Sequence, residues 1–341
     1  MREMRDSGVE WIGEIPKDWN CCKQKYRFTL INGRAFKDNE FEEDGTYRIL
    51  RVGNLFSNPV WYSSSLELEP DKYCEKGDLI YAWSMSYGPY IWNEEKVIYH
   101  YHIWKTKLVS DMDKMFSYYY LQALTESIKS QTHETTMGFV TMGIMNNSYI
   151  AYPRNIKEQK KISNYLDIKC SKIDEIIEKQ QAIIEKLKEY KLSIIIETVT
   201  KGLNPNVEMK DSGVEWIGQM PTSWDCTTVG MIATVVRGAS PRPAGDPLYF
   251  NGNDVPWITV AEVTKGDGKY IDETETFLTF EGAKQSRIVE EGTLLLSNSG
   301  ATLGVPKITR IRGCINDGSV AFYNLSINQE FLLYLFKGRT F

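Results

Sequence analysis

Two carboxylates and a lysine in the first third of the chain have the types found in metal-dependent nucleases. Asp71 follows a proline, and Glu94 and Lys96 stand two residues apart further along. In such enzymes carboxylates hold Mg²⁺, and a lysine stabilises the charge that develops on the reacting phosphate. The chain has 45 acidic residues, so this spacing also arises by coincidence, and Glu94-Glu95-Lys96 equally favours a charged hairpin tip. Nuclease chemistry is therefore an alternative interpretation.

Histidine offers a second candidate chemistry, metal binding. His100 and His102 flank Tyr101, so a strand over 97–104 would place both imidazoles on one face. His133 is the one other histidine, and no third ligand is evident, which favours ordinary packing. The phosphate-binding patterns G-x-x-x-x-G-K-[ST] and G-x-G-x-x-G are both absent from the sequence. The sequence therefore predicts no metal site, no cofactor and no catalytic residue.

The elements that would position these residues come in two copies. The segment Met4–Trp19 returns as Met209–Trp224, 205 residues later, with eleven of 16 positions identical. A repeat unit of about 200 residues has the size of a domain, far above that of a solenoid repeat. We therefore expect two tandem domains, each beginning at one copy of this opening segment.

The composition of the opening segment indicates a short irregular segment that packs on its own domain. Asp-Ser-Gly is a turn signal, and it is followed by Val, Trp and Ile and then by an X-Pro step that keeps the backbone extended. We expect the segment to fold onto the domain that follows and to bury the faces of its tryptophans. Direct contact of these tryptophans with a partner is the alternative.

The overall composition is that of a soluble globular protein. The chain of 341 residues exceeds one ordinary core, and 25% of its residues are charged. No run of 18 apolar residues and no signal-peptide pattern is present, and the six cysteines form no C-x-x-C pair. We expect a cytoplasmic protein without a membrane partner. Its net charge of −5 means that any DNA binding needs a local basic face.

The first domain reads as mixed α and β. Residues 20–155 are dominated by short β-prone runs between turn residues, interrupted by one helical pattern over about 113–129. The runs that predict strands are 47–52, 78–83, 97–104 and 148–152.

A long helix is predicted from residue 156 to about residue 200. Glycine and proline are absent there, and eight of ten a and d positions of a heptad pattern are apolar or aromatic. Such a helix would span about 65 Å and needs a partner, because its apolar stripe would otherwise face water. Gly202 and Pro205 end it. The residues predicted to pair with another helix are Ile162, Leu166, Ile173, Ile176, Gln180, Ile183, Leu187, Tyr190 and Ile194.

Fainter echoes continue inside the second copy. Residues 51–55, 75–80 and 116–121 correspond to 259–263, 290–295 and 331–336, while the sequence between them has diverged. One scaffold with different loops suggests two related binding tasks on two targets. Phe341 aligns near Glu126, so counterparts of the remaining part of the first domain and of the long helix are expected to be missing. The second domain is therefore expected to be incomplete.

These features together resemble the DNA-specificity subunit of type I restriction-modification systems. The resemblance rests on the duplicated D-S-G-V-E-W-I-G segments, on Glu75-Lys76-Gly77-Asp78-Leu79, and on the Pro–Glu-Gln–Ile pattern within 150–162. It implies an α+β fold with two tandem mixed α/β target-recognition domains joined by a long coiled-coil-type helix. The implied boundaries are 1–155 for the first recognition domain, 156–203 for the spacer helix, and 204–341 for the incomplete second domain.

The resemblance also implies a function. Each recognition domain would read one half of a bipartite site in double-stranded DNA, without catalysis by this chain. Methyltransferase and restriction subunits would dock on it, and the whole complex would be a DNA adenine methyltransferase and ATP-dependent endonuclease. The long helix would also allow self-association with a second copy. Alternatives are an incomplete cassette that recombines with a full-length gene, and a coiled-coil scaffold with no nucleic-acid role.

Polar residues in the divergent loops are the candidates for contact with DNA. Arginine reads guanine and Asn or Gln reads adenine at base edges, while Lys, Arg, Ser and Thr contact phosphates. For each residue, a solvated turn is the alternative. The candidates are Arg34, Lys37, Arg51, Asn54, Ser84, Ser86 and Tyr87 in the first domain, and Arg237, Arg242, Thr259, Glu262, Ser297, Asn298, Ser299 and Thr302 in the second.

Overall fold

The computed structural model describes residues 2–56, 58–131, 138–300 and 303–339. It divides into two compact units, Met1–Ile177 (unit 1) and Glu178–Phe341 (unit 2). The boundary between them falls inside the long helix α3 (Ile156–Lys201), so each unit includes part of this helix.

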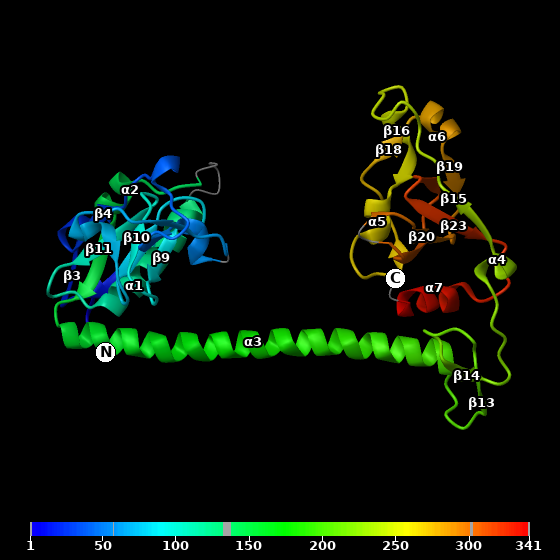
Figure 1. The fold of residues 1–341 in the computed structure, drawn as a ribbon, viewed down its shortest axis with the longest axis horizontal. Helices are drawn as coiled ribbons and strands as arrows, with labels where there is room; N and C mark the ends of the chain where they lie inside the picture. Colours follow the sequence, from blue (N-terminus) through cyan, green and yellow to red (C-terminus); the bar gives the residue numbers. More distant parts are fainter. Residues whose placement is uncertain (1, 57, 132–137, 301–302, 340–341) are drawn as a thin grey trace. The chain divides into compact units, whose positions relative to one another are not determined.

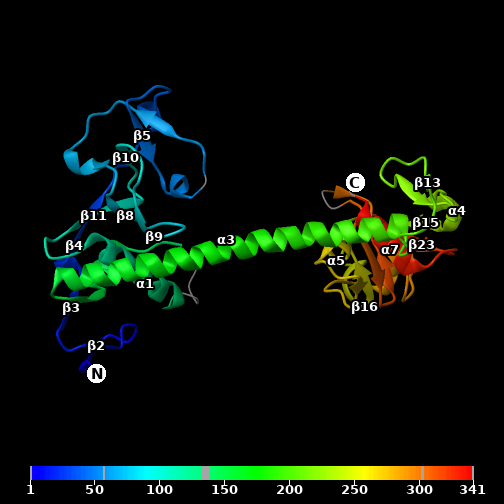
Figure 2. The ribbon, with the colours of Figure 1, turned by 90° about the horizontal axis from the view of Figure 1, so that it is seen from below.

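Unit 1 is built from two sheets and a covering helix. The outer sheet consists, in order, of β6 (Tyr62–Ser64), β5 (Tyr47–Leu50), β10 (Val97–Tyr99) and β7 (Tyr73–Cys74). The inner sheet consists, in order, of β4 (Phe28–Asn32), β11 (Ile103–Leu108), β8 (Leu79–Ala82) and β9 (Gly88–Ile91). Helix α1 (Lys114–Gln131) packs on the inner sheet, and Figure 2 shows the outer sheet, the inner sheet and α1 as successive layers.

Side-chain alternation along β8 explains this layering. Leu79 and Tyr81 belong to the core between the inner sheet and α1, whereas Ile80 and Ala82 belong to the core between the two sheets. Successive residues of a strand point to opposite faces. All four of these side chains are buried because both faces of the inner sheet are covered, which is why this strand reads as an uninterrupted apolar run.

Shorter elements complete unit 1. The remaining strands are β1 (Met4–Asp6), paired with β2 (Glu14–Pro16), and β3 (Trp19–Lys23), paired with β12 (Tyr149–Pro153). The short helices are η1 (Gln24–Tyr26), η2 (Asp38–Glu40), η3 (Val52–Leu55), η4 (Pro70–Lys72) and α2 (Met142–Asn147).

Unit 2 has the same layers. Its outer sheet consists, in order, of β18 (Phe277–Leu278), β16 (Phe250–Ile258), β22 (Gly313–Ile315) and β19 (Arg287–Val289). Its inner sheet consists, in order, of β15 (Thr234–Arg237), β23 (Ser319–Tyr323), β20 (Leu294–Ser297), β21 (Pro306–Thr309) and β17 (Tyr270–Ile271). The other elements are β13 (Met209–Asp211), β14 (Gln219–Pro221), α4 (Val229–Ile232), α5 (Val260–Thr264), α6 (Phe280–Gln285) and α7 (Gln329–Gly338). In Figure 1, α7 lies beside the inner sheet of this unit.

The two units repeat one topology in their two sheets, and unit 2 adds a fifth inner strand, β17, which pairs parallel with β21. In each outer sheet a central parallel pair, β5–β10 or β16–β22, is flanked by antiparallel neighbours. The order β4-β11-β8-β9 of one inner sheet recurs as β15-β23-β20-β21 in the other. This confirms the prediction of tandem domains of mixed α and β structure.

The opening segments fold onto their domains as predicted. The Trp19 ring packs edge-on against Phe116 of α1 with centroids 6.4 Å apart, and Trp224 packs in the same way against Phe331 of α7 at 6.0 Å. In addition, Trp11 packs against Tyr120 at 5.7 Å. The corresponding turns are closed by the same backbone hydrogen bond, from residue 7 to residue 13 and from residue 212 to residue 218.

The structure confirms both predicted helices and corrects one predicted strand. The helical pattern over 113–129 is α1, and the long helix runs over Ile156–Lys201 and ends at Gly202, whose φ is +76°. The single strand predicted over 97–104 is wrong. It is two strands, β10 in the outer sheet and β11 in the inner sheet, separated by a three-residue turn.

The predicted pairing stripe of α3 is exposed over most of its length. Ile162 packs against the unit 1 core, but Ile173 and Leu187 are 54% and 59% exposed. The other exposed members of the stripe are Ile176, Gln180, Ile183, Tyr190 and Ile194, while Leu166 is half-buried. Among the described residues, no helix combines the length and the apolar character needed to span a bilayer.

Candidate nucleic-acid interface

The turn between the outer and inner sheets differs in side-chain chemistry between the two units. It consists of His100, Tyr101 and His102 in unit 1 (turn 100–102) and of Asn316, Asp317 and Gly318 in unit 2 (turn 316–318). The backbone framework is the same. The amide of His100 donates to Leu50 O at 2.9 Å, and the amide of Asn316 donates to Ile258 O at 3.3 Å. Position by position, the two turns are therefore equivalent.

A glycine presses against each turn from the end of the first inner strand. An added Cβ at Gly33 would overlap the carbonyl oxygens of Tyr99 and His100, and one at Gly238 would overlap that of Asn316. The Gly33 amide also donates to Ile103 O at 3.1 Å. Both turns are thus held by close backbone packing, which leaves their side chains free to vary.

Turn 100–102 carries an aromatic cluster. Trp83, at the end of β8, donates from its amide to His102 O at 3.0 Å and from its indole to Tyr101 O at 2.7 Å. The imidazole of His102 lies 4.8 Å from the Trp83 ring and 4.8 Å from the His100 ring, between centroids. These flat side chains offer stacking faces as well as ring N–H groups.

Both imidazoles of the turn are held in the neutral form. Burial, followed by charge repulsion from the nearby His102 and Arg51, lowers the pKa of His100 to about 4. Burial, together with Arg51, also lowers the pKa of His102. A neutral imidazole presents one donor and one acceptor, so at neutral pH the turn offers mixed hydrogen-bonding groups rather than positive charge.

Turn 316–318 carries an acidic residue surrounded by donors. Ser240 Oγ donates to Asp317 Oδ1 at 2.5 Å, and Arg237 Nε donates to the Asp317 carbonyl oxygen at 2.8 Å. The Arg242 guanidinium lies 3.8 Å from Asp317 Oδ2. The Ser240 hydrogen bond, followed by the charges of Arg237 and Arg242, holds the pKa of Asp317 below its usual value. The carboxylate is therefore ionised at neutral pH.

The end of β20 and the start of α5 border this turn. The Asn298 amide donates to Gly318 O at 2.9 Å, and its side-chain nitrogen, oriented toward the same oxygen, lies 2.8 Å away. A Cβ at Gly318 would approach Ser299 Oγ to 3.1 Å and Val260 Cβ to 3.2 Å. Three segments distant in sequence therefore meet at one place.

Several predicted contact residues of unit 1 are engaged within the fold. The Arg34 guanidinium forms a two-point ion pair with Glu40, with N–O distances of 2.6 and 3.2 Å. The Asn54 side chain accepts from the Arg51 amide at 3.1 Å and donates to the carbonyls of residues 58 and 60. Asn54 thereby fastens its own loop.

The other unit 1 candidates lie around or beyond the turn. The Arg51 side chain faces turn 100–102 and stacks on Tyr62 at 4.9 Å. Ser84 follows Trp83 directly. Lys37 is exposed before η2, Ser86 is exposed, and Tyr87 is half-buried.

The unit 2 candidates converge more closely. Arg237, Arg242, Asn298 and Ser299 all lie at turn 316–318, as described above. Three others lie beside it or below it. Thr259 is the residue before α5, Glu262 lies within α5, and Ser297 is buried with its Oγ accepting from the Val305 amide at 2.8 Å. Thr302 lies outside the described residues, as does His133.

Sequence reasoning missed the turn residues themselves. The sequence favours ordinary packing for His100 and His102, with metal binding as the alternative, and it does not mark Ser240, Asn316 or Asp317 as contacts. The repeat could have pointed to them, because extending the correspondence of 75–80 with 290–295 forward aligns Trp83 with Asn298 and brings the two turns within one residue of each other. Trp83 aligns with Asn298 in the same way, since each donates to the last residue of its turn.

The three nuclease-type residues do not form a shared site. Glu94 pairs with Arg48 at 2.9 Å, Lys96 pairs with Glu75 at 3.5 Å, and Asp71 has Lys72 at 3.7 Å. Within the described part of the chain, no group of three His, Cys, Asp or Glu side chains is placed to hold a metal ion. The nuclease alternative gains no support from this arrangement.

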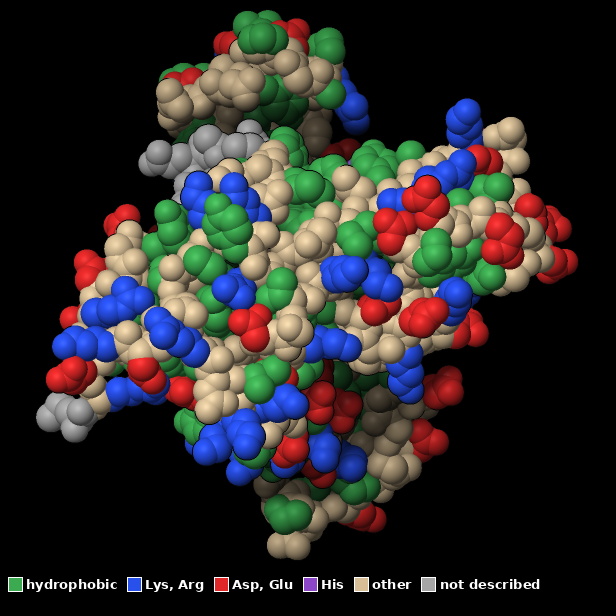
Figure 3. Space-filling view, turned by 90° about the vertical axis from the view of Figure 1, so that its left-hand side faces the viewer, with side chains coloured by type: hydrophobic (Ala, Val, Ile, Leu, Met, Phe, Trp, Pro, Cys, Tyr) green, Lys and Arg blue, Asp and Glu red, His purple; other side chains and the backbone are tan. Residues whose placement is uncertain are grey.

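Charged side chains are mixed on the surface. On the face shown in Figure 3, Lys and Arg side chains lie scattered among Asp and Glu and among hydrophobic side chains. This pattern agrees with the net charge of −5. A nucleic-acid interface on this protein would therefore depend on local groups such as those at the two turns.

Known proteins share both the sequence pattern and the fold. The sequence model of the type I restriction modification DNA specificity domain matches residues 16–189. The MjaIX specificity subunit of Methanocaldococcus jannaschii is 32% identical over 130 residues, which are 36% of this chain and 29% of that protein. The EcoBI specificity subunit of Escherichia coli is 22% identical over 205 residues, which are 58% of this chain and 42% of that protein. The chain spans less than half the length of these curated relatives.

Two solved structures support the fold. A chain from a structure on complex assembly and conformational transition of the type I R-M system aligns with a TM-score of 0.61 at 15% identity, over 94% of this chain and 80% of that chain. The HsdS subunit from Thermoanaerobacter tengcongensis aligns with a TM-score of 0.50 at 15% identity, over 95% of this chain and 80% of that one. Together with the family match over half of its length, the duplicated topology shows that this chain belongs to the family of type I restriction-modification DNA specificity domains.

Proposed function

We propose that this chain is a non-catalytic, sequence-specific DNA-recognition subunit of a type I restriction-modification complex. Residues 1–155 form one target-recognition domain, 156–203 the spacer helix and 204–341 the second recognition domain. Each domain reads one half of a bipartite site in double-stranded DNA. Methyltransferase and restriction subunits dock on the chain and supply the chemistry.

One observation carries this proposal: an identical backbone framework presents different side chains at equivalent turns. Turn 100–102 offers neutral imidazoles and aromatic faces, whereas turn 316–318 offers an ionised carboxylate with arginines beside it. Base edges are distinguished by their patterns of donors and acceptors, and Asp or Glu accepts from the amino group of cytosine whereas Arg donates to guanine. Two recognition domains with the same backbone framework would thus select different base sequences.

The remaining polar loop residues fit a supporting role around the turns. Phosphate contacts position a protein on the duplex and base contacts specify sequence. We propose base contacts for the two turns and for Asn298, and phosphate contacts for Arg51, Arg242 and Ser299. The other residues predicted from sequence stay as proposed contacts of the surrounding loops.

Helix α3 supports a second part of the proposal. Its exposed stripe from Ile173 to Ile194 has the heptad spacing of a helix-pairing surface. We propose that this stripe binds a second helix of the same kind, either within a complex or from another copy of the chain.

Exchange of the turns tests the recognition proposal. The complex with its methyltransferase partner would carry unit 1 with Asn-Asp-Gly at 100–102, and preferred sites would be selected from random duplexes. The expected result is a change in one half-site with the other half-site retained, because each good base contact contributes about 1–3 kcal/mol of discrimination. The matched control is Lys284→Gln on α6, which should leave both half-sites unchanged. A folded exchange variant that keeps the original preference in both halves would contradict the proposal.

A further inference from the structure

Unit 2 contains a pocket between the end of α3, the end of α7 and the loops 264–268 and 303–306. Its volume is about 660 Å³. Four segments line it: the end of α3, the end of α7, the loop 264–268 after α5 and the segment 303–306 before β21. All four belong to unit 2.

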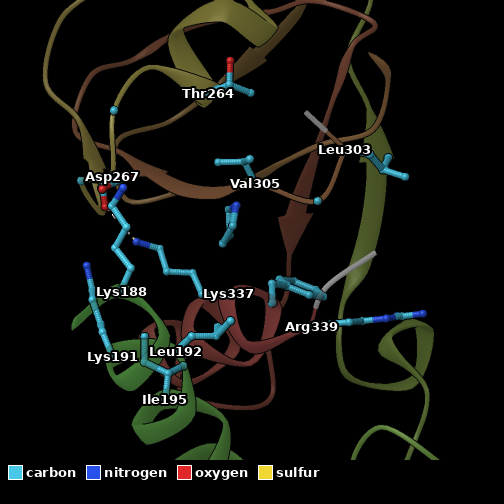
Figure 4. A pocket seen from close by; sticks show the side chains of 15 residues that line it. Lys188, Lys191, Leu192, Ile195, Thr264, Asp267, Leu303, Val305, Lys337 and Arg339 are labelled. Atoms are coloured by element: carbon cyan, nitrogen blue, oxygen red, sulfur yellow. Dashed lines mark hydrogen bonds between the residues drawn. The ribbon is translucent and has the colours of Figure 1, made fainter. Parts of the chain in front are cut away.

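Lysines dominate the charge of this pocket. Lys188 and Lys191 come from α3 and Lys337 from α7, and in Figure 4 all three point toward the loop that carries Asp267. Arg339 also lines the pocket but points away from this group. Asp267 is the one acidic residue of the lining, so a net positive region exists in a chain whose overall charge is −5.

These positive charges are poorly neutralised by the protein. Lys337 Nζ donates to the main-chain carbonyl of Asp267 at 3.1 Å, and Lys188 pairs with Glu185 on its own helix at 3.1 Å. Among the ion pairs of the described residues, none includes Lys191 or Lys337. Lys191 and Lys337 are therefore available to an anion.

The pKa of Lys337 also indicates that positive charge is not neutralised here. Burial lowers its pKa, and the neighbouring lysines 191 and 307 lower it further by repulsion. Lys307 is itself only 3% exposed, and its Nζ donates to the carbonyl of Lys265 at 2.6 Å. An anion bound between these lysines would relieve the repulsion, because it would place negative charge where several positive charges converge.

We propose that this pocket binds a phosphate group. Lysine ammonium groups act as point charges that suit a phosphate, which can accept several donors at once. The loop beside them is open to such a ligand, since neither Gly266 nor Gly268 has any heavy atom within 4 Å of an added Cβ. The phosphate can come from two sources, the DNA backbone or a free phosphate compound such as a nucleotide.

The pocket is joined to the recognition site by one loop. The Gly304 amide donates to Ser297 O at 2.9 Å, and Ser297 leads directly into Asn298 and Ser299 at turn 316–318. A phosphate in the pocket would therefore lie against the same loop that borders the turn. For the DNA source, the inference rests on the proposed recognition function; for a free phosphate it does not.

The test compares Lys191→Gln/Lys337→Gln with the matched control Lys284→Gln in the full chain. Inorganic phosphate and ATP are titrated by calorimetry, and a short duplex is titrated at several salt concentrations. A free-phosphate site predicts wild-type binding that weakens at least tenfold in the double variant and not in the control. A DNA-backbone site predicts no free binding but a DNA affinity about tenfold lower for every sequence, with a salt slope shallower by about one per lost contact.

Either result supports the pocket and names the source. The inference is overturned if neither phosphate nor DNA binding responds to the double substitution, including the case in which only binding of the methyltransferase partner weakens, since the pocket would then be a protein-docking surface. Failure of the recognition function is a separate outcome. It would appear as sequence-blind DNA binding by the wild type, while free-phosphate binding could still be present or absent.

Discussion

Gly33 and Gly238 hold the same position in the two units. Each directly follows the first strand of an inner sheet. Each also lies so close to turn 100–102 or turn 316–318 that an added Cβ would overlap a carbonyl oxygen of that turn. Their amides donate to the first residue of the next inner strand, at 3.1 Å to Ile103 O and 2.9 Å to Ser319 O. One backbone contact thus fixes both turns, whatever their side chains.

Gly33→Ala and Gly238→Ala should each destabilise the unit that contains them. The added methyl must displace the turn backbone, and overpacking of this kind costs about 1–3 kcal/mol. Urea unfolding of the full chain measures the effect. The matched control is Gly230→Ala in α4, where an added Cβ meets nothing within 4 Å. Equal stability of the Gly33 variant and this control would show that the turn is not held as described.

His100→Asn should remove part of the pH dependence of stability. The folded pKa of His100 is about 4, whereas its ordinary value is 6.5. Below pH 6.5 the unfolded chain therefore binds a proton that the folded chain does not, and the free energy of unfolding falls as the pH drops toward 4. Asparagine occupies the equivalent position 316, so the fold accommodates it.

The measurement is urea unfolding of wild type and variant at pH 7.5 and pH 5. The wild type should lose more stability than the variant over this interval. Parallel losses in the two proteins would contradict the assignment of a neutral, buried His100.

The two turns also show how far sequence could predict this fold. In unit 2 the turn is Asn-Asp-Gly, a strong turn signal. In unit 1 it is His-Tyr-His within the run 97–104, which carries no glycine or proline. The turn there packs against Gly33, which is distant in the sequence, so local pattern predicted one strand where the structure has two. The repeated opening segment and the heptad pattern, by contrast, are local signals and predicted their elements correctly.

The candidate DNA contacts were also predicted only in part. Arg242 and Ser299 were found because polar loop residues tend to face solvent, and they do lie at the turn. Asn54 is likewise a polar loop residue, yet its side-chain amide is hydrogen-bonded to the backbone of its own loop. Sequence shows which side chains could contact DNA, but the partner that occupies each of them depends on loop geometry that only the structure provides.

Trp19→Phe should cost more stability than Trp224→Phe. Both rings pack edge-on against a phenylalanine, but only Trp19 has an indole hydrogen bond among the described residues, to Glu158 Oε1 at 3.3 Å. Loss of one such bond costs about 1 kcal/mol. Unfolding in urea, followed for each variant, gives the difference. Adding Glu158→Ala to both variants should remove most of it, and a difference that persists there would assign the effect to packing instead.

Leu187→Asp should abolish self-association of the chain without unfolding it. Leu187 is 59% exposed within the stripe on α3, so a charge there costs little in an isolated copy but would be buried unpaired in a helix pair. Light scattering after size-exclusion chromatography measures the change. Ala182→Asp introduces the same charge on an exposed position of α3 outside the stripe and should leave association intact. A wild type that stays monomeric at high concentration would refute pairing between copies and leave the stripe to a partner within the complex.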